Sequence, residues 1–266
     1  MEIAVLDKGF VRLVEVMGSD ASIVQAARVS YGSGTKTVRE DAALIDYLMR
    51  HRHTSPFEMV EFKFHVKAPI FVVRQWFRHR TASVNEISGR YSVLREEFYE
   101  PQAWRKQAQR NRQGSEGEVS DEEASLLLQG VEREAYQAYQ TLLEKGIARE
   151  MARMVLPLNL YTEFYWKQDL HNLFHFLALR LDPHAQWEIR QYAKAIAEIV
   201  KAHVPLAWGS FEEHVLEGAH LSRTEIKALQ GLLTPELYEK ALKELGLSGS
   251  RLQEALEKIF NPGLPD

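Results

Sequence analysis

The sequence contains no cysteine among its 266 residues. This absence excludes disulfide bonds, thiolate metal sites and cysteine nucleophiles together. Long hydrophobic runs are also absent, and none approaches the ~20 apolar residues that cross a membrane. Residues 1–5 lack the basic start and long apolar core of a signal peptide. We therefore expect a cytoplasmic protein with no membrane partner.

Two nucleotide-binding motifs and an excess of basic residues are missing as well. No G-x-G-x-x-G follows a strand and no G-x-x-x-x-G-K-[ST] occurs, so neither a Rossmann-type flavoprotein nor a phosphate-loop protein is predicted. The net charge of −4 disfavours non-specific binding to nucleic acid. Hydrophobic residues make up 45% and charged residues 26%, which is ordinary for a soluble globular protein.

One short polar segment, residues 78–90, carries most of the functional information. It reads R-H-R-T-A-S-V-N-E-I-S-G-R, and apolar stretches flank it on both sides. A polar, turn-like cluster between buried elements is costly unless it binds something. Arginine forks suit phosphate or carboxylate groups, and small residues allow close backbone approach. The segment therefore predicts a binding site for a planar, anionic ligand.

Hydrophobic periodicity outlines the rest of the chain. Val60, Phe62, Phe64 and Val66 alternate with polar residues and predict a strand with one buried face. Further strands are predicted over residues 2–6, 10–17 and 158–167, and helices over 20–29, 38–50, 70–79, 120–145, 170–181 and 183–204. Asp20 is expected to cap its helix, and Ser120 with Glu123 forms a capping box. Residues 31–34 and 100–117 are predicted loops, the second one exposed.

These elements predict an α+β fold, with a small, mostly antiparallel sheet surrounded by long helices. Residues 1–217 form the predicted main domain. From residue 218 to 266 the composition shifts to short helices rich in Leu, Glu and Lys, which predicts a small helical C-terminal appendage. The broad apolar faces of the long helices favour packing between subunits.

The pattern R-H-R-x-x-S-x-N-E-x-S-x-R at residues 78–90 resembles the signature of the flavin-dependent thymidylate synthases at every specified position. The resemblance covers residues 1–217 and includes the stretches 56–58, 74–77, 156–161 and 184–188. It implies reductive methylation of dUMP to dTMP, with 5,10-methylenetetrahydrofolate as one-carbon donor and NADPH reducing a bound FAD. It also implies a homotetramer whose sites are shared between subunits.

The resemblance further implies the roles of individual residues. Contacts to FAD are implied for His53, Ser55, Arg78, His79, Arg80, Glu86, Asp169, Leu170, His171 and His175. Contacts to dUMP are implied for Gln75, Trp76, Phe77, Arg78, Glu86, Ile87, Ser88, Gly89, Arg90, Arg153 and Arg180. The chain departs from the family at Asp169 and His175, where relatives commonly carry Asn, although Asp and His can both still form hydrogen bonds.

Arg180 is the catalytic residue that the resemblance implies. A permanent cation beside N3 and its neighbouring carbonyls stabilises negative charge on the uracil ring. Electron density then rises at C5, which becomes nucleophilic without covalent help from a thiolate. The better-known thymidylate synthases use a cysteine for this step, and this chain has none.

Plainer interpretations stay open at the level of sequence. The arginine cluster could be a solvated turn, Glu86 could pair with Arg78 or Arg90, and Arg153 and Arg180 could each form a buried ion pair. His171 and His175 have the i, i+4 spacing of metal ligands, but no third ligand is evident, so no metal is predicted. Alternative functions are a flavin-dependent uracil methyltransferase acting on RNA and a non-catalytic nucleotide- or nucleic-acid-binding module.

Overall fold

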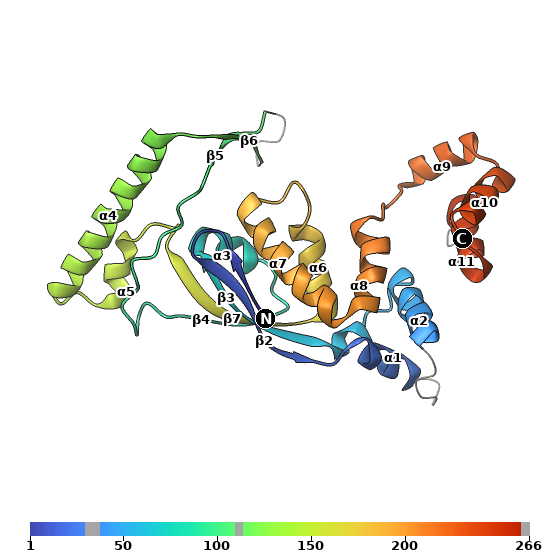
Figure 1. The fold of residues 1–266 in the computed structure, drawn as a ribbon, viewed down its shortest axis with the longest axis horizontal. Coiled ribbons are helices and arrows are strands. Elements are labelled where there is room, and N and C mark those ends of the chain that lie inside the picture. The colour runs from blue at the N-terminus through green and yellow to red at the C-terminus, as the bar shows by residue number, and fades with distance from the viewer. Residues whose placement is uncertain (30–37, 110–113, 262–266) are drawn as a thin grey trace. The chain divides into compact units, whose positions relative to one another are not determined.

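The computed structural model describes residues 1–29, 38–109 and 114–261, which form two compact units. One unit spans Met1–Leu216 and the other Glu217–Asp266 (Figure 1). The predicted loop at 31–34 lies outside the described residues. Within the described residues, no helix is both long and apolar enough to span a membrane.

A five-stranded antiparallel sheet forms the centre of the larger unit, which confirms the predicted α+β class. Its strands follow the spatial order β1 (Glu2–Val5), β2 (Gly9–Met17), β3 (Glu61–Pro69), β7 (Tyr161–Asp169) and β4 (Ser83–Glu86). The predicted alternation in β3 is confirmed, because Phe62, Phe64 and Val66 are fully buried while Lys63 and His65 lie on the opposite face. The buried face thus fixes the register of β3 in the sheet.

Helices cover this buried face and flank the sheet. They are α1 (Asp20–Arg28), α2 (Val38–Arg50), α3 (Ile70–Trp76), α4 (Glu122–Glu144), α5 (Arg149–Ala152), α6 (Leu170–Arg180), α7 (Trp187–His203) and α8 (Pro205–Phe211). Short η2 (Phe57–Met59), η3 (Arg153–Val155) and η4 (Glu212–Leu216) join them. Elements α3, α6 and α7 pack on the sheet, where the rings of Trp76, Trp166 and Phe176 meet at centroid distances of 5.0–5.3 Å.

The polar segment 78–90 is not the simple turn that the sequence suggested. Its residues Ser83–Glu86 form strand β4, which pairs with β7 through Val84 opposite Trp166 and Glu86 opposite Phe164. All four residues of β4 are exposed, so no buried face imposed an alternating pattern on the sequence. The free edge of β7 requires backbone partners, and the segment supplies them.

The predicted loop over residues 100–117 is mostly exposed, as expected, but it contains two strands; its residues 110–113 lie outside the described residues. Strands β5 (Trp104–Gln107) and β6 (Ser115–Val119) pair as an antiparallel hairpin. The Trp104 indole Nε1 donates to Ser125 Oγ at 2.9 Å, which anchors the hairpin to α4. Most side chains of this hairpin are exposed, so it has no apolar face that periodicity could detect.

Two predictions of helix N-caps, Asp20 for α1 and Ser120 for α4, were wrong. Helix α4 is capped by Asp121, which accepts from the Ala124 amide at 2.9 Å, in place of Ser120. Asp20 does not cap its own helix, whose N-cap is Ser19. Its two carboxylate oxygens accept from the backbone amides of Leu206 and Ala207, each at 2.9 Å. Asp20 therefore caps α8, and this contact ties α8 to the N-terminal end of the chain.

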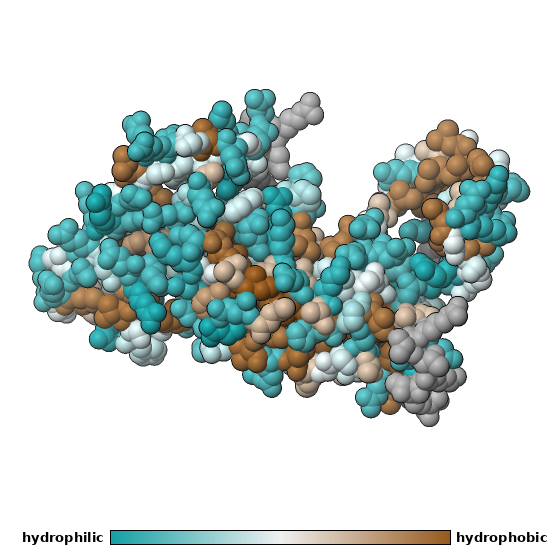
Figure 2. Space-filling model, viewed as in Figure 1, coloured by the Kyte–Doolittle hydropathy of each residue, from teal (hydrophilic) through white to brown (hydrophobic). Residues whose placement is uncertain are grey.

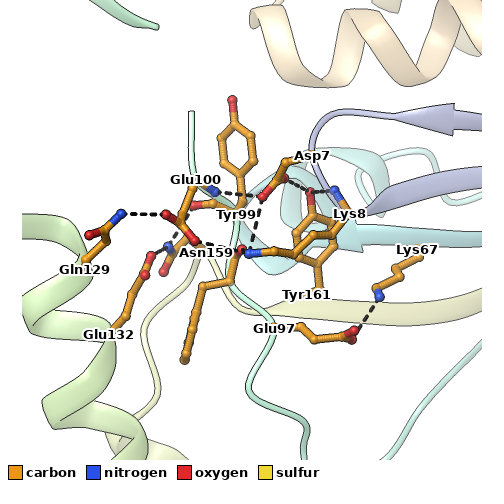
Figure 3. A network of polar contacts seen from close by, with 11 residues as sticks. Asp7, Lys8, Lys67, Glu97, Tyr99, Glu100, Gln129, Glu132, Asn159 and Tyr161 are labelled. Atoms are coloured by element: carbon orange, nitrogen blue, oxygen red, sulfur yellow. Dashed lines mark hydrogen bonds and ion pairs between the residues drawn. The ribbon is translucent and has the colours of Figure 1, made fainter. Parts of the chain in front are cut away.

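A polar network joins the β1–β2 turn to β7 and α4 (Figure 3). The Tyr161 hydroxyl donates to Asp7 Oδ1 at 2.5 Å, and burial is the main cause that raises the pKa of Tyr161. Lys8 Nζ donates to Glu100 Oε1 at 3.2 Å, while Gln129 of α4 donates to the other oxygen of Glu100 at 2.8 Å. These contacts hold residues 97–100, which lead into the hairpin, against the sheet.

The smaller unit consists of α9 (Arg223–Leu232), α10 (Pro235–Glu244) and α11 (Gly249–Phe260). Ser222 and Glu225 form a reciprocal capping box at α9, and Thr234 accepts from the Leu237 amide at α10. Among the described residues of this unit, Leu242 and Ile259 are buried. On the face drawn in Figure 2, hydrophobic side chains interrupt the polar surface of both units.

Candidate active site

Arg180, the predicted catalytic residue, is the last residue of α6 and is partly buried. Its Nε donates to His79 Nε2 at 3.0 Å, and its Nη2 donates to the Gln75 carbonyl oxygen at 3.4 Å. The described chain supplies no carboxylate partner to this guanidinium, so the alternative of a buried ion pair is contradicted. Burial lowers the pKa of Arg180 without removing its charge under physiological conditions.

His79 follows α3 and accepts the hydrogen bond from Arg180 as a neutral ring. Burial, then the charge of Arg180, then His175 lower the pKa of His79 to about 4. Its ring packs against Phe176 and His175 at centroid distances of 4.9 and 5.9 Å. A neutral imidazole orients the guanidinium without cancelling its charge, so Arg180 remains an uncompensated cation. Gln75, His79, His175 and Arg180 are called the Arg180 cluster below.

A second polar group, the Arg153 cluster, consists of Ser88, Gly89, Arg90, Glu150 and Arg153. Arg90 Nε donates to Glu150 Oε2 at 3.0 Å, and Gly89 lies against the stem of Arg153. A Cβ on Gly89 would lie 3.1 Å from Arg153 Cδ and 3.0 Å from Leu94 Cδ1, so only glycine fits without displacing a neighbour. Arg153 is exposed and lies in η3, which contradicts the alternative of a buried ion pair.

The other residues predicted to bind dUMP differ in how exposed their side chains are. Trp76 is fully buried in the aromatic core, so its side chain cannot contact a ligand from this chain. Phe77 is partly buried against Phe164, with ring centroids 5.1 Å apart. Ile87 is 47% exposed at the end of β4. The burial of Trp76 was not predicted, because the stretch 74–77 matches the family as a whole and only the fold shows which of its side chains face the core.

Several residues predicted to contact FAD are exposed cations or imidazoles. Arg78 and Arg80 are exposed and, within the described chain, make no ion pair. His53 is exposed after α2, where its ring lies 5.9 Å from that of Tyr47, and Ser55 is exposed two residues later. Exposed guanidinium groups without an ion pair suit the pyrophosphate of a dinucleotide such as FAD.

The other predicted FAD residues have structural partners of their own. Glu86 accepts from the Thr162 hydroxyl at 2.7 Å, while Arg90 pairs with Glu150, so the alternative pairing of Glu86 with Arg78 or Arg90 is not found among the described residues. The carboxylate of Asp169 caps α6, accepting from the amide and the side chain of Asn172 at 2.9 and 2.7 Å. Leu170 is fully buried and its amide donates to Val60, so it offers a ligand little surface.

Asp169 and His175, the two residues that depart from the family pattern, lie in different surroundings. Asp169 is a good N-cap, as Asn would also be, so the change preserves the start of α6. His175 is exposed beside His79, and His171 is partly buried one turn earlier. No group of three or more His, Asp or Glu among the described residues is arranged to hold a metal ion.

One contact was not foreseen from the sequence. The side-chain amide of Gln75 donates to the side-chain carbonyl of Gln186, which lies just before α7. The only signal in the sequence was the stretch 184–188, which matches the family without indicating a contact. The pairing joins segments 111 residues apart, and local patterns carry no information about such a distance.

Comparisons with known proteins agree on one family. A family model described as thymidylate synthase complementing protein matches residues 12–206. A flavin-dependent thymidylate synthase of Thermus thermophilus is 81% identical over 99% of this chain and 97% of its own length. The corresponding Treponema denticola protein is 56% identical, with 97% of each chain covered.

A solved structure is also similar to this chain. It is a UMP/dUMP methylase from Streptomyces cacaoi bound with 5-bromo-dUMP. The similarity has a TM-score of 0.75 at 34% identity and covers 82% of this chain and all of that chain.

Proposed function

We propose that this chain, which belongs to the flavin-dependent thymidylate synthase family, methylates dUMP with 5,10-methylenetetrahydrofolate as one-carbon donor and NADPH as reductant. The family predicted from residues 78–90 is confirmed by these relatives. FAD, when bound, supplies the reducing equivalents for the methyl group. The two co-substrates are inferred from the family resemblance.

The observation that carries this proposal is the state of Arg180. A chain without cysteine must activate C5 of uracil without a thiolate. Arg180 is a partly buried cation whose partners, His79 and the Gln75 carbonyl, are neutral. Such a group stabilises negative charge on the carbonyl oxygens O2 and O4 of a uracil ring, which raises electron density at C5.

The Arg153 cluster suits the phosphate of dUMP. Arg90 and Arg153 are exposed and Ser88 is partly buried, so two guanidinium groups and a hydroxyl are available to an anion, while the buried Gly89 lets Arg153 pack closely beside them. Glu150 holds Arg90 in place in the absence of substrate, and a phosphate dianion competes for the same guanidinium. The phosphate contacts fix the substrate, while the Arg180 cluster acts on its base.

For the flavin, we propose the exposed donors His53, Ser55, Arg78, Arg80 and His175, with the partly buried His171, as side-chain contacts. Arg78 and Arg80 would neutralise the pyrophosphate, and the imidazoles would lie near ring systems. Glu86, Asp169 and Leu170 already have partners within the chain, so we assign them mainly the task of shaping this site.

We further propose a homotetramer in which each site combines residues of different subunits. Exposed apolar side chains lie close in sequence to the residues of the Arg153 cluster, namely Ile87, Tyr91, Val93, Met151, Met154 and Leu158. The two segments that carry them are adjacent, because Arg149 Nη1 donates to the Tyr91 carbonyl at 3.0 Å. Several exposed apolar side chains on two adjacent segments beside a polar site favour a subunit interface.

A spectroscopic assay tests the proposal. Purified protein reconstituted with FAD should absorb as a flavoprotein, bleach under anaerobic NADPH, and convert dUMP to dTMP only when methylenetetrahydrofolate is present. UMP and a short uracil-containing RNA serve as comparison substrates. Failure to bind FAD, or flavin reduction without any dTMP, would overturn the proposed function. Light scattering of the same sample measures the oligomeric state.

A further inference from the structure

A chain of hydrogen bonds runs from the Arg180 cluster to the β5–β6 hairpin. Gln75 Nε2 donates to Gln186 Oε1, and Gln186 Nε2 donates to Glu188 Oε2 at 2.8 Å. The other oxygen of Glu188 accepts from Arg105 Nη2 and, at 3.4 Å, from the Tyr99 hydroxyl. Glu188 is only 3% exposed, so this carboxylate depends on these partners.

Which partner donates and which accepts in each of these hydrogen bonds follows from Glu188 alone. A carboxylate paired with arginine only accepts hydrogen bonds. Gln186 must therefore turn its NH₂ group toward Glu188, which leaves its carbonyl oxygen toward Gln75. Gln75 must in turn direct its own NH₂ group to Gln186. The side-chain oxygen of Gln75 is then left for a ligand, since it has no partner within the described chain.

Two glutamines alone would not impose this order. Each amide carries a donor on one side and an acceptor on the other, and a pair of them can reverse together at little cost. One direction is selected when the group at the end away from Gln75 can accept hydrogen bonds but cannot donate them. Glu188 supplies it, and Arg105, whose guanidinium also lies 4.8 Å above the Trp187 ring, holds that carboxylate in place.

We infer that Glu188, acting through Gln186, orients the Gln75 amide so that its oxygen accepts a hydrogen bond from N3–H of the uracil base. This inference rests on the proposed function. In a uracil nucleotide N1 carries the sugar, so N3–H is the single donor on the ring edge, between two carbonyl acceptors. An oriented acceptor from Gln75 beside the cationic Arg180 therefore matches the donor and acceptor order of this base. Glu188 and Gln186 are positioning residues, because they act through Gln75.

The test compares ligand binding by the FAD-loaded protein, measured by calorimetry and by the change in flavin absorption. The ligands are dUMP and 3-methyl-dUMP, which lacks the N3–H donor. Glu188→Gln should weaken dUMP binding by about tenfold, because the amide chain can then reverse. Binding of 3-methyl-dUMP should change less, so that the discrimination between the two ligands shrinks. Lys106→Ala, a change of the exposed neighbour of Arg105 on β5, is the matched control and should bind like wild type.

Two further variants separate orientation from general damage. Gln186→Leu leaves the Glu188–Arg105 pair intact but interrupts the chain, and it should reproduce the effect of Glu188→Gln. In the Gln75→Ala background, Glu188→Gln should add no further loss of dUMP affinity. Three outcomes would overturn the inference. Glu188→Gln could lower the affinity for both ligands equally, the losses of dUMP affinity could add up in the double variant, or Gln186→Leu could bind dUMP like wild type. These outcomes would not contradict the proposed function as long as the wild-type protein methylates dUMP.

Discussion

The Arg180 cluster and the Arg153 cluster both present arginine to a ligand, but the two hold their cations differently. Arg180 is partly buried and has only neutral partners, His79 and the Gln75 carbonyl. Arg90 and Arg153 are exposed, and Arg90 is paired with Glu150. A cation in a low-dielectric setting acts strongly on a nearby π system, whereas an exposed one is screened by water. The surroundings of the cation therefore suit one cluster to activation and the other to capture of a phosphate.

The largest expected effect comes from removing the uncompensated cation. Arg180→Ala should lower kcat for dTMP formation by about 10²–10³-fold, the range found when a group that stabilises transition-state charge is lost. FAD content should remain, because the residue lies at the end of α6 and its loss leaves the core unchanged. Steady-state kinetics and the flavin spectrum measure both quantities. An active Arg180→Ala protein would show that activation of the ring lies elsewhere.

Substitutions in the Arg153 cluster should raise KM for dUMP and leave kcat nearly unchanged. Arg153→Ala or Arg90→Ala should raise KM for dUMP by about 10–100-fold, corresponding to one charge-assisted hydrogen bond of ~1.5–3 kcal/mol. Deoxyuridine, which lacks the phosphate, should bind equally weakly to wild type and variants. Glu150→Gln should lower KM for dUMP modestly, since it frees Arg90. A drop in kcat equal to that of Arg180→Ala would erase the distinction between the clusters.

A smaller change tests the fit within the Arg153 cluster. Gly89→Ala places a methyl group 3.1 Å from Arg153 Cδ, so Arg153 must shift slightly. We expect KM for dUMP to rise roughly threefold to tenfold, below the ~100-fold that a full ångström of misplacement costs. Gly130→Ala is the matched control, because nothing lies within 4 Å of its added Cβ. Identical kinetics for both variants would mean that Gly89 is not needed for its small size.

The smallest effect concerns the neutral partner of Arg180. The pKa of His79 is lowered from 6.5 to about 4, so between these pH values the unfolded chain binds more protons at this residue. Its contribution to the free energy of unfolding is therefore greatest above pH 6.5 and is lost as the pH falls toward 4. Denaturant titrations at several pH values should show a shallower pH dependence for His79→Gln than for wild type. An unchanged slope would indicate that His79 titrates normally.

Patterns of period two and the residue types of segment 78–90 were enough to predict much of this protein. The alternation in β3 predicted which side chains face the core, because burial on one face of a strand is a local property. The hairpin at 104–119 and strand β4 could not be predicted in this way. Their side chains are mostly exposed, and their pairing depends on backbone groups that every residue carries.

The sequence by itself determined the family, the residue types available for chemistry and the need to activate uracil without a thiol. Only the tertiary structure decided which partners these residues have. His79 meets Arg180 across 101 residues, and Asp20 caps a helix 186 residues away. Hydrogen bonds act over about 3 Å in space regardless of separation along the chain. The charge state of His79, the freedom of Arg180 and the direction of the Gln75 amide therefore arise only when distant segments are brought together.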